Sequence, residues 1–300
     1  MEADSRKTPS GYLVDTFEGL KAEFTDFEEL SRSEYNVVVR AKRYGRWWVL
    51  KGLLPEFAAL ESHQQMLRKE FEVMMSLQHP FVVQAFEIEQ VEVLGLCIVM
   101  EYVDGPTLGD WLETQPAVSA RRRIADCLIE AVGYAHINDV VHRDLKPSNV
   151  IVTGNGSGVK LIDFGLADTE SHAVLKQPAG TPGYMSPEQM EQFSPDVRND
   201  IYSLGIVLRE MDLWRYYKEV IARCLASVDH RYATVDDLRR GITAALPLSR
   251  PRPPASSRAT PSSVWPSLRA SRCICTRCVR SMSPPWATCA ARCRAWDLKC

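Results

Sequence analysis

The stretch "HRDLKPSN" at residues 142–149 brings several charged and polar side chains into one short segment. Asp144 lies two residues from the cation Lys146 and five residues from the neutral amide Asn149. A carboxylate can accept the proton of a hydroxyl group, while a nearby cation neutralises negative charge on phosphate. The spacing therefore predicts a phosphoryl-transfer site, for which the rest of the chain must supply a metal site and a nucleotide site.

A β-hairpin is predicted directly after Asn149. The stretch "VIVTGNGSGVKLIDFG" at residues 150–165 contains two short β-branched runs around a glycine-rich turn. In an antiparallel pair the start of the first strand lies beside the end of the second, so we expect Asn149 and Asp163 side by side. Their side-chain oxygens are the hard ligands that Mg²⁺ takes while it keeps waters and nucleotide phosphates.

A cation for the nucleotide phosphates is expected at Lys51. Residues 35–54 form two β-rich runs about a turn at residues 44–45, which predicts a hairpin with Lys51 on its second strand. In residues 61–80, apolar side chains recur at helical spacing. Glu70 lies on the same face of this helix as the apolar residues, so it is placed to meet Lys51 where the helix docks on the strands.

The remaining elements follow from the same periodicities. Residues 81–90 and 95–103 are strand-like runs that complete a small antiparallel sheet. Helical spacing predicts one helix that follows Ser119, which would be its N-cap, and a buried helix over residues 199–211. Two short helices are expected to close the domain, at "YKEVIARCL" and "TVDDLRRGIT".

The composition is that of an ordinary globular chain, with 45% hydrophobic and 25% charged residues among 300. Its apolar stretches are far shorter than the roughly 20 residues of a membrane-spanning helix. The first residues also carry no apolar core of the kind found in a secretory signal. We therefore expect a cytoplasmic protein with no membrane segment and no nucleic-acid partner.

Charge and cysteine are distributed unevenly along the chain. Residues 1–248 carry 37 Asp and Glu against 26 Lys and Arg, whereas residues 249–300 carry one acid against ten basic residues. Six of the nine cysteines lie at or after Cys273, but their spacing matches no standard zinc site. We expect a disordered tail at 249–300. The abrupt change of composition also leaves open a loss of the natural reading frame near residue 250.

Four motifs occur along the chain: "VLK" at 49–51, "HRDLKPSN" at 142–149, "DFG" at 163–165 and "GTPGYMSPE" at 180–188. In this order and spacing, the chain resembles the eukaryotic-type serine/threonine protein kinase family across residues 27 to about 245. The resemblance implies an α+β, bilobal fold. Its N-lobe would hold a small antiparallel β-sheet with one main helix, and its C-lobe would be mostly helical.

The resemblance also implies domain boundaries. The expected parts are an N-terminal extension at 1–26, a protein kinase domain at 27–248 and the tail at 249–300. Within the kinase domain, the N-lobe would end at about residue 100, the hinge would span 101–103, and the C-lobe would span 104–248.

For the site, the resemblance implies a role for each residue that matches a family motif. Asp144 would be the catalytic base, Lys146 would contact the transferring phosphate, and Thr181 is typical of the serine/threonine pattern. Asn149 and Asp163 would be the Mg²⁺ ligands. The residues that would bind ATP are Leu30, Val38, Val49, Lys51, Glu70, Met100, Glu101, Val103 and Ile151.

Within that set, Val38, Val49 and Ile151 would sandwich the adenine. Met100 falls at the gatekeeper position, before the hinge residues 101–103.

Four further residues would support the site through structural contacts. Glu188 is expected to pair with Arg231, and Asp200 of the buried helix is expected to anchor the catalytic loop. His142 would be a structural histidine packed beneath that loop.

The chain departs from the family where a glycine-rich loop should precede Val37. The aligned residues 31–36 read "SRSEYN", with Ser31, Ser33 and Asn36 at the glycine positions. Glycine lets the backbone approach phosphate and adopt positive φ, so its replacement is expected to weaken nucleotide binding without abolishing it.

Three functions follow from these motifs. The first is a kinase that uses ATP and Mg²⁺ to phosphorylate serine or threonine hydroxyls of protein substrates. The second is a catalytically silent pseudokinase scaffold. A small-molecule phosphotransferase is disfavoured by Lys146 and by "GTPGYMSPE", which resemble a platform for protein substrates.

Two other features bear on substrates and regulation. Thr169 and Ser171 are candidate sites of autophosphorylation. Between Met211 and Glu219 only "DLWRYYK" intervenes, where the family carries a longer loop and an extra helix.

Overall fold

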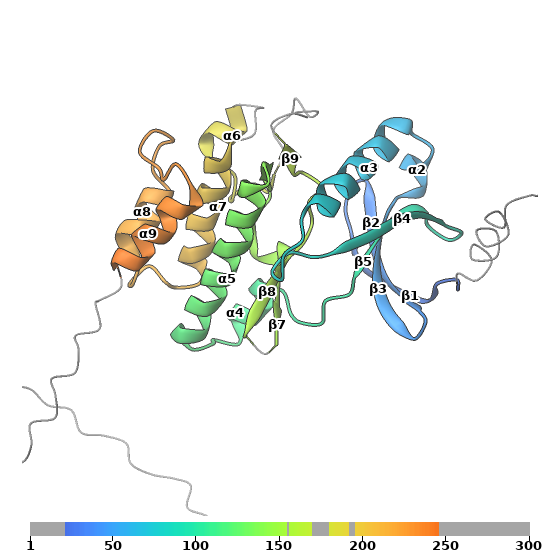
Figure 1. Cartoon of the computed structure of the whole chain (residues 1–300), viewed down its shortest axis with the longest axis horizontal. Coiled ribbons are helices and arrows are strands. Elements are labelled where there is room, and N and C mark those ends of the chain that lie inside the picture. The colour runs from blue at the N-terminus through green and yellow to red at the C-terminus, as the bar shows by residue number, and fades with distance from the viewer. Residues whose placement is uncertain (1–21, 155, 170–179, 192–195, 246–300) are drawn as a thin grey trace, which may run out of the picture. The chain divides into compact units, whose positions relative to one another are not determined.

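The computed structural model describes residues 22–154, 156–169, 180–191 and 196–245. They belong to the first of the two units into which the chain divides, Met1–Leu248. The tail predicted at 249–300 lies outside the described residues. Along the described residues of this unit, five strands and two helices (blue to cyan in Figure 1) precede a mainly helical part (green to orange).

The N-lobe is built on a five-stranded antiparallel sheet in the order β1-β2-β3-β5-β4. The strands are β1 (Thr25–Arg32), β2 (Asn36–Arg43), β3 (Arg46–Leu53), β4 (Ala85–Val91) and β5 (Gly95–Glu101). Tyr44 and Gly45 form the turn between β2 and β3, with φ of 52° and 72°. Positive φ at both positions suits a two-residue hairpin turn, because its twist matches that of the strands. The hairpin predicted at 35–54 is confirmed.

The two faces of this sheet have different surroundings. On one face, Val37 and Val39 of β2 pack with Leu50 of β3 in a small cluster of the N-lobe. Ile98 and Met100 of β5 belong instead to the larger core that continues into the C-lobe. Because successive side chains of a strand point to opposite faces, Ile98 and Met100 lie on the face of the sheet that is directed toward the C-lobe.

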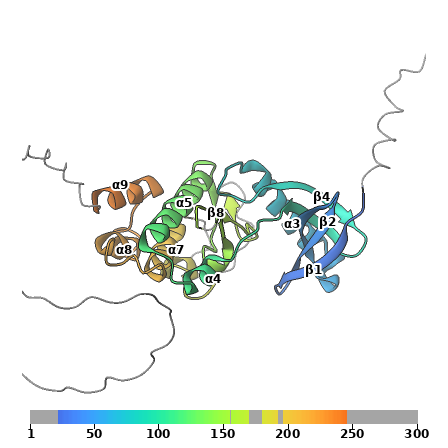
Figure 2. The ribbon, with the colours of Figure 1, turned by 90° about the horizontal axis from the view of Figure 1, so that it is seen from below.

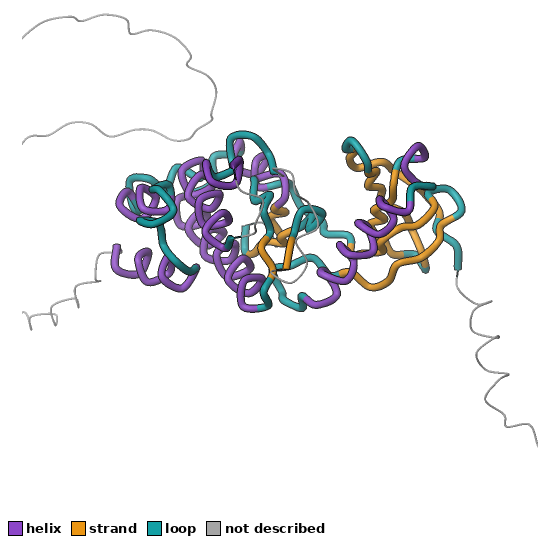
Figure 3. The backbone as a smooth tube through the Cα atoms, turned by 90° about the horizontal axis from the view of Figure 1, so that it is seen from above, coloured by secondary structure: helices purple, strands orange, loops and turns teal. Residues whose placement is uncertain are grey.

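One main helix, α3 (Glu61–Ser76), packs against the sheet, and the short helix α2 (Pro55–Ala58) precedes it (Figure 3). Its buried residues are Leu67, Glu70, Val73 and Met74. These positions recur at helical spacing, so one face of α3 is directed inward. The carboxylate of Glu70 therefore lies on the docking face, as the sequence predicts.

The C-lobe contains six α-helices among the described residues. They are α4 (Leu108–Glu113), α5 (Val118–Ile137), α6 (Pro187–Glu191), α7 (Val197–Glu210), α8 (Lys218–Cys224) and α9 (Val235–Ala245). Helices α5 and α7 contact each other in the lobe (Figure 2). The predicted buried helix at 199–211 corresponds to α7, in which Ile201 and Leu204 have no exposed surface.

Short strands of the C-lobe flank two of the motifs, "HRDLKPSN" and "DFG". They are β6 (Val140–Val141), β7 (Val150–Thr153), β8 (Gly158–Leu161) and β9 (Asp168–Thr169), with a 3₁₀ turn, η1, at Pro147–Asn149. Strands β7 and β8 form the predicted hairpin, and β6 pairs with β9. The "HRDLKPSN" segment therefore runs between β6 and β7, and "DFG" follows β8.

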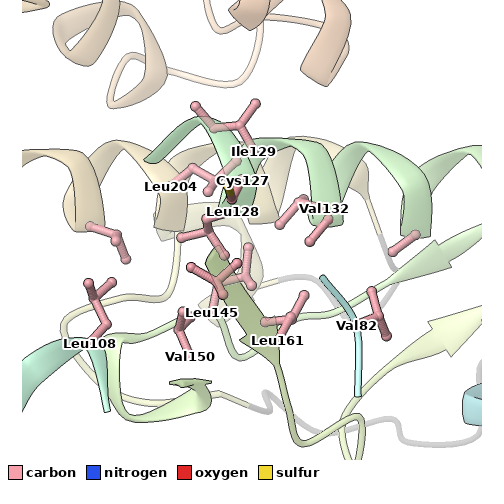
Figure 4. Packing of buried hydrophobic residues seen from close by; sticks show 14 of the residues in the cluster. Val82, Leu108, Cys127, Leu128, Ile129, Val132, Leu145, Val150, Leu161 and Leu204 are labelled. Atoms are coloured by element: carbon pink, nitrogen blue, oxygen red, sulfur yellow. The ribbon is translucent and has the colours of Figure 1, made fainter. Parts of the chain in front are cut away.

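A continuous hydrophobic core lies beneath these strands (Figure 4). Leu128 and Val132 of α5 and Leu204 of α7 approach Leu145, which belongs to the "HRDLKPSN" segment, and Leu161 of β8. Protein interiors are close-packed, so side chains anchored in such a core have little room to move. The segment that carries Asp144 is thus fixed from below.

The fold class predicted from the sequence is confirmed. A small antiparallel sheet with one main helix is joined to a mostly helical lobe. The predicted N-cap at Ser119 is wrong, because α5 begins at Val118 after Ala117 and has no side-chain cap. Among the described residues, every helix is too short or too polar to cross a bilayer. The predicted location stays a prediction.

Candidate active site

Lys51, Glu70 and Asp163 form one ionic network between the two lobes. Nζ of Lys51 donates to Oε1 of Glu70 at 2.6 Å and to Oδ1 of Asp163 at 2.8 Å. Lys51 comes from β3, Glu70 from α3, and Asp163 follows β8. Lys51 and Glu70 are each only 6% exposed. The predicted pairing of Lys51 with Glu70 is confirmed, and Asp163 joins the pair.

The charges of this network shift one another's pKa values. Burial alone would lower the pKa of Lys51, but Glu70 and Asp163 outweigh it, so the pKa is raised. The Lys51 ammonium lowers the pKa of Asp163 to about 2. Burial raises the pKa of Glu70. Lys51 thus holds a permanent positive charge, and ionised donors of this kind make the stronger hydrogen bonds to phosphate.

Three strands present four of the nine predicted ATP-binding side chains on one face of the sheet. Val38 lies opposite Lys51 in the β2–β3 ladder, and Val49 lies opposite Met100 in the β3–β5 ladder. Directly opposed residues of an antiparallel pair share a face, as do residues two apart on a strand. The structure therefore groups these four side chains. Leu30 lies on β1 with 48% of its surface exposed.

The segment predicted as the hinge, residues 101–103, is joined to the C-lobe by a lysine. Nζ of Lys160 donates to Oε1 of Glu101 at 2.6 Å and to the backbone oxygen of Val82 at 3.0 Å. The backbone N–H of Gln84 donates to the same oxygen of Glu101 at 2.9 Å. Lys160 lies directly opposite Ile151 in the β7–β8 hairpin. These bonds thereby hold β7, the strand that carries Ile151, in a fixed position relative to residues 101–103.

Asp144, Lys146 and Thr181 form a closed hydrogen-bonded group. The Asp144 carboxylate accepts from Nζ of Lys146 at 2.6 Å and from the backbone N–H of Thr181 at 2.8 Å. The Thr181 hydroxyl donates to Oδ1 of Asp144 at 2.7 Å and accepts from Lys146 at 2.7 Å. Asp144 is 7% exposed. The structure thus brings together three residues that the sequence separates by up to 37 positions.

Asn149 is held beside Asp144 and at the entry to the β7–β8 hairpin. Its Nδ2 donates to the backbone oxygen of Asp144 at 2.9 Å and to Oδ2 of Asp144 at 3.1 Å. Its backbone oxygen accepts from Ile162, directly before Asp163, at 2.9 Å. The predicted proximity of Asn149 and Asp163 along the hairpin is confirmed.

The donor set at this place fits a hard cation. Asn149 uses its amide nitrogen for Asp144, so its Oδ1 is the atom it would offer a metal. Asp163 accepts from Lys51 and from the Gly165 N–H through Oδ1, so Oδ2 is the oxygen it would offer. One neutral and one anionic oxygen are what Mg²⁺ accepts when phosphates and waters supply the rest.

The "HRDLKPSN" segment is anchored from α7 by a buried carboxylate. Asp200 accepts the backbone N–H groups of His142 and Arg143, both at 2.8 Å, and Nε2 of His136 lies 2.8 Å from it. These bonds hold Arg143 at φ 67°, a conformation that L-residues rarely adopt. His142 has no exposed surface, contacts the Ile162 carbonyl and faces the Phe164 ring. The predicted structural contacts of Asp200 and His142 are confirmed.

The predicted ion pair between Glu188 and Arg231 is also present. The guanidinium donates to both carboxylate oxygens of Glu188 and to the backbone oxygens of Ala226 and Arg198. The Arg231 side chain is fully buried. A planar guanidinium can serve several acceptors at once, so this contact ties α6 to the segment before α9.

The segment that replaces the glycine-rich loop is a short turn between β1 and β2. The Ser33 N–H donates to the Asn36 carbonyl at 2.9 Å, and the Asn36 N–H donates to Oγ of Ser33 at 3.2 Å. Neither residue, nor Ser31, is among the described residues with positive φ. The backbone of this turn therefore does not need glycine.

The structure describes little of the two predicted phosphorylation sites. Ser171 is outside the described residues, and Thr169 is described only by its backbone in β9. The short connection after α7 is described: α8 begins at Lys218, and Tyr217, just before it, is buried.

Two residues of the site were missed by sequence reasoning. Lys160 is a lysine in an apolar strand, three residues before Asp163, and His136 is a polar residue at the apolar end of α5. A charged or polar residue in an otherwise buried run usually has a buried partner, and that signal could have identified both.

Comparison with known proteins agrees with this geometry. A family model described as "Protein kinase domain" matches residues 24–221. The serine/threonine-protein kinase PknB of Mycolicibacterium smegmatis is 37% identical over 186 residues, which are 58% of this chain and 29% of that protein. PknB of Mycobacterium tuberculosis (strain ATCC 25618 / H37Rv) is 35% identical over 189 residues, again 58% of this chain and 29% of that protein. The chain thus spans less than a third of the length of these relatives.

Proposed function

Because the chain belongs to the protein kinase domain family, we propose that it transfers the terminal phosphoryl group of ATP to a serine or threonine hydroxyl of a protein substrate. The observation that best supports this proposal is the hydrogen-bonded group of Asp144, Lys146 and Thr181. A proton acceptor and a cation in direct contact suit the attack of a hydroxyl group on phosphate.

The nucleotide would lie between the lobes. Val38 and Val49 would contact the adenine from the sheet, and Ile151 would contact it from β7. Backbone groups of the hinge would bind the edge of the base, at the place where Lys160 holds Glu101. Lys51, with its raised pKa, would neutralise charge on the phosphates that are not transferred.

The metal site would consist of Asn149 and Asp163. A bound Mg²⁺ supplies charge neutralisation on the phosphates during transfer. Asn149 would hold it through Oδ1, an orientation that its two hydrogen bonds to Asp144 favour. Asp163 is ready to act as a ligand at neutral pH, because its pKa of about 2 keeps the carboxylate ionised.

Asp144 would accept the proton of the acceptor hydroxyl. Thr181 bonds Oδ1 and Lys146 bonds Oδ2, so the carboxylate is held in one orientation before the substrate arrives. Such preorganisation avoids reorientation during the reaction. Lys146 lies within hydrogen-bond distance of this base, where it would contact the phosphoryl group as it moves toward the acceptor.

The choice of acceptor rests on Lys146, Thr181 and the relatives. The two PknB proteins are named serine/threonine-protein kinases, which supports the same acceptor class here. Autophosphorylation at Thr169 or Ser171 is part of this proposal, because both residues follow the "DFG" motif closely in the chain.

The test compares the parent protein with Asp144→Asn in labelled ATP and Mg²⁺, with protein and metabolite acceptors in separate reactions. We expect the parent to label protein serine or threonine, and the variant to lose a factor of about 10² to 10⁴ in rate, as is typical of a lost general base. Asp104→Asn, which changes an exposed carboxylate, is the matched control.

Binding of Mg·ADP by calorimetry separates the alternatives. Equal labelling by the parent and Asp144→Asn would contradict the proposal. A parent that binds Mg·ADP but labels nothing would favour the pseudokinase alternative, for which the replacement of the glycines at residues 31–36 is the supporting observation.

A further inference from the structure

Three aromatic rings meet at the tip of the turn between β1 and β2. The ring of Tyr35 lies 5.0 Å from that of Phe57 in an edge-on arrangement and 5.2 Å from that of His63. The rings of Phe57 and His63 are 4.9 Å apart. Tyr35 belongs to the turn, Phe57 to α2 and His63 to α3, whose positions Figure 1 shows. Each ring therefore contacts both others, across three elements.

Backbone bonds attach the same turn to the end of β3. The Leu54 N–H donates to the carbonyl of Tyr35 at 2.8 Å, and the Ser33–Asn36 bonds close the turn itself. Asn36 and Leu53 are paired in the ladder. The turn is thus fixed on its backbone side by β3 and on its side-chain side by Phe57 and His63.

The ring cluster reaches the ionic network through α3. His63 precedes Glu70 by seven residues, which is close to two helical turns, so the two side chains lie on one face of α3. One cavity is lined by the turn, by this face of α3 and by the "DFG" glycine, and its lining includes Tyr35, His63, Glu70 and Gly165. The turn and the partner of Lys51 therefore border the same space.

We propose that Tyr35, Phe57 and His63 are positioning residues for nucleotide binding. They hold the glycine-free turn between β1 and β2 in a fixed position beside the site of the nucleotide phosphates. The proposal rests on the proposed function, because it requires a nucleotide phosphate bound beside the turn. In a glycine-rich loop the backbone would be free to close around the phosphates. Here the ring cluster sets the position of the turn before the nucleotide binds.

The test uses variants of the full chain. Tyr35→Ala and His63→Ala remove one ring each, and Tyr35→Phe keeps the ring. Phe86→Ala is the matched control, because Phe86 also forms an edge-on pair, with Trp48 at 5.2 Å, but on β4 at the edge of the sheet. Each protein is measured for Mg·ADP affinity by calorimetry, for KM and kcat, and for hydrogen exchange of the Asn36 and Leu54 amides without nucleotide.

We expect Tyr35→Ala and His63→Ala to weaken Mg·ADP binding and raise the KM for ATP by about three- to tenfold, the range of one or two aromatic contacts. The kcat should change by less than about twofold, because the contacts act on binding. Exchange at Asn36 and Leu54 should accelerate in both variants. Tyr35→Phe should behave as the parent does. The variant that combines Tyr35→Ala and His63→Ala should lose no more Mg·ADP affinity than the weaker-binding of the two single variants, since the rings act as one unit.

The proposal is overturned if Tyr35→Ala matches Phe86→Ala in affinity and in exchange, or if the two single losses add fully. A parent that binds Mg·ADP and shows these ring effects, but transfers no phosphate, would contradict the proposed function and leave this inference standing. A parent that binds no Mg·ADP would overturn both.

Discussion

Thr181 is joined to Asp144 by two hydrogen bonds to the same carboxylate oxygen, from its backbone N–H at 2.8 Å and from its hydroxyl at 2.7 Å. Asp144 follows α5 after the short strand β6, and Thr181 belongs to the "GTPGYMSPE" segment, which runs into α6. The orientation of the proposed base therefore depends on where that segment lies.

Replacing Thr181 tests this dependence. Thr181→Val keeps the shape of the side chain but removes the hydroxyl, and with it the bond to Asp144 and the acceptor for Lys146. A hydrogen bond to a charged group contributes about 1.5 kcal/mol, so we expect kcat to fall about tenfold. Thr181→Ser, which keeps the hydroxyl, should retain most of the rate. Steady-state kinetics that show equal kcat for the valine variant and the parent would contradict the proposed role.

The Lys51–Asp163 contact predicts a pH dependence. The folded pKa of Asp163, about 2, lies below its ordinary value of 3.8, so ionisation stabilises the fold above about pH 3.8 and is lost as the pH falls toward 2. Because 45% of the Asp163 side chain is exposed, solvent screens its interaction with Lys51. We therefore expect the pair to contribute less than about 1 kcal/mol to the free energy of unfolding.

Lys51→Met should return the pKa of Asp163 to 3.8 or above, as measured by carboxyl carbon NMR. The same variant should raise the KM for ATP, because the phosphates lose their cation. Lys42→Met removes a partly exposed lysine that pairs with Asp26 and serves as the control. An unchanged Asp163 titration in Lys51→Met would contradict the electrostatic account.

Asp200→Asn should destabilise the fold. Burial would raise the pKa of Asp200, but the hydrogen bond from His136 and the charges and N–H groups around it outweigh burial and lower the pKa. An amide would direct a donor at N–H groups that need an acceptor, at a cost of about 3 kcal/mol in the free energy of unfolding. Denaturant unfolding measures this loss. Asp212→Asn changes a carboxylate that is 59% exposed and pairs with Arg121, so it should cost less than about 1 kcal/mol in the free energy of unfolding. Equal losses in the two variants would refute the anchoring role of Asp200.

Arg231→Lys should also lower stability, although it keeps the charge. Arg231 donates to Glu188, Ala226 and Arg198 through three nitrogens, whereas lysine has one. We expect a loss of about 2 kcal/mol in thermal or denaturant unfolding. Arg240→Lys changes an arginine that is 76% exposed and should leave the midpoint within error of the parent. If Arg231→Lys leaves the unfolding midpoint unchanged, charge alone is needed at this position.

Much of the site could be predicted because its parts are set by local sequence. The hairpin turns at Tyr44–Gly45 and between β7 and β8 have strong local signals, and they place Lys51 on its strand and Asn149 near Asp163. Helical periodicity alone placed Glu70 on the inner face of α3. These features depend on residues within one hairpin or one helix.

Other parts depended on the family resemblance or could not be predicted. The contact between Asp144 and Thr181 joins residues 37 positions apart, and no local pattern gives it. The prediction of an N-cap at Ser119 was wrong because α5 begins at Val118. Ala117 occupies the N-cap position and has no capping side chain. The ring cluster of Tyr35, Phe57 and His63 arises from the packing of three elements, which leaves no periodic signal in the sequence.

The bond from Lys160 to Glu101 has a consequence for the movement of the two lobes. Beside it, the N–H of Val83 donates to the Leu161 carbonyl at 2.9 Å, and the N–H of Leu161 donates to the Phe81 carbonyl at 2.8 Å. These bonds connect the two lobes along one edge, so we expect any movement between the lobes to be a rotation about that edge. Displacement grows with distance from a pivot, so we expect the nucleotide of the proposed function to enter and leave on the side of the lobes away from these bonds.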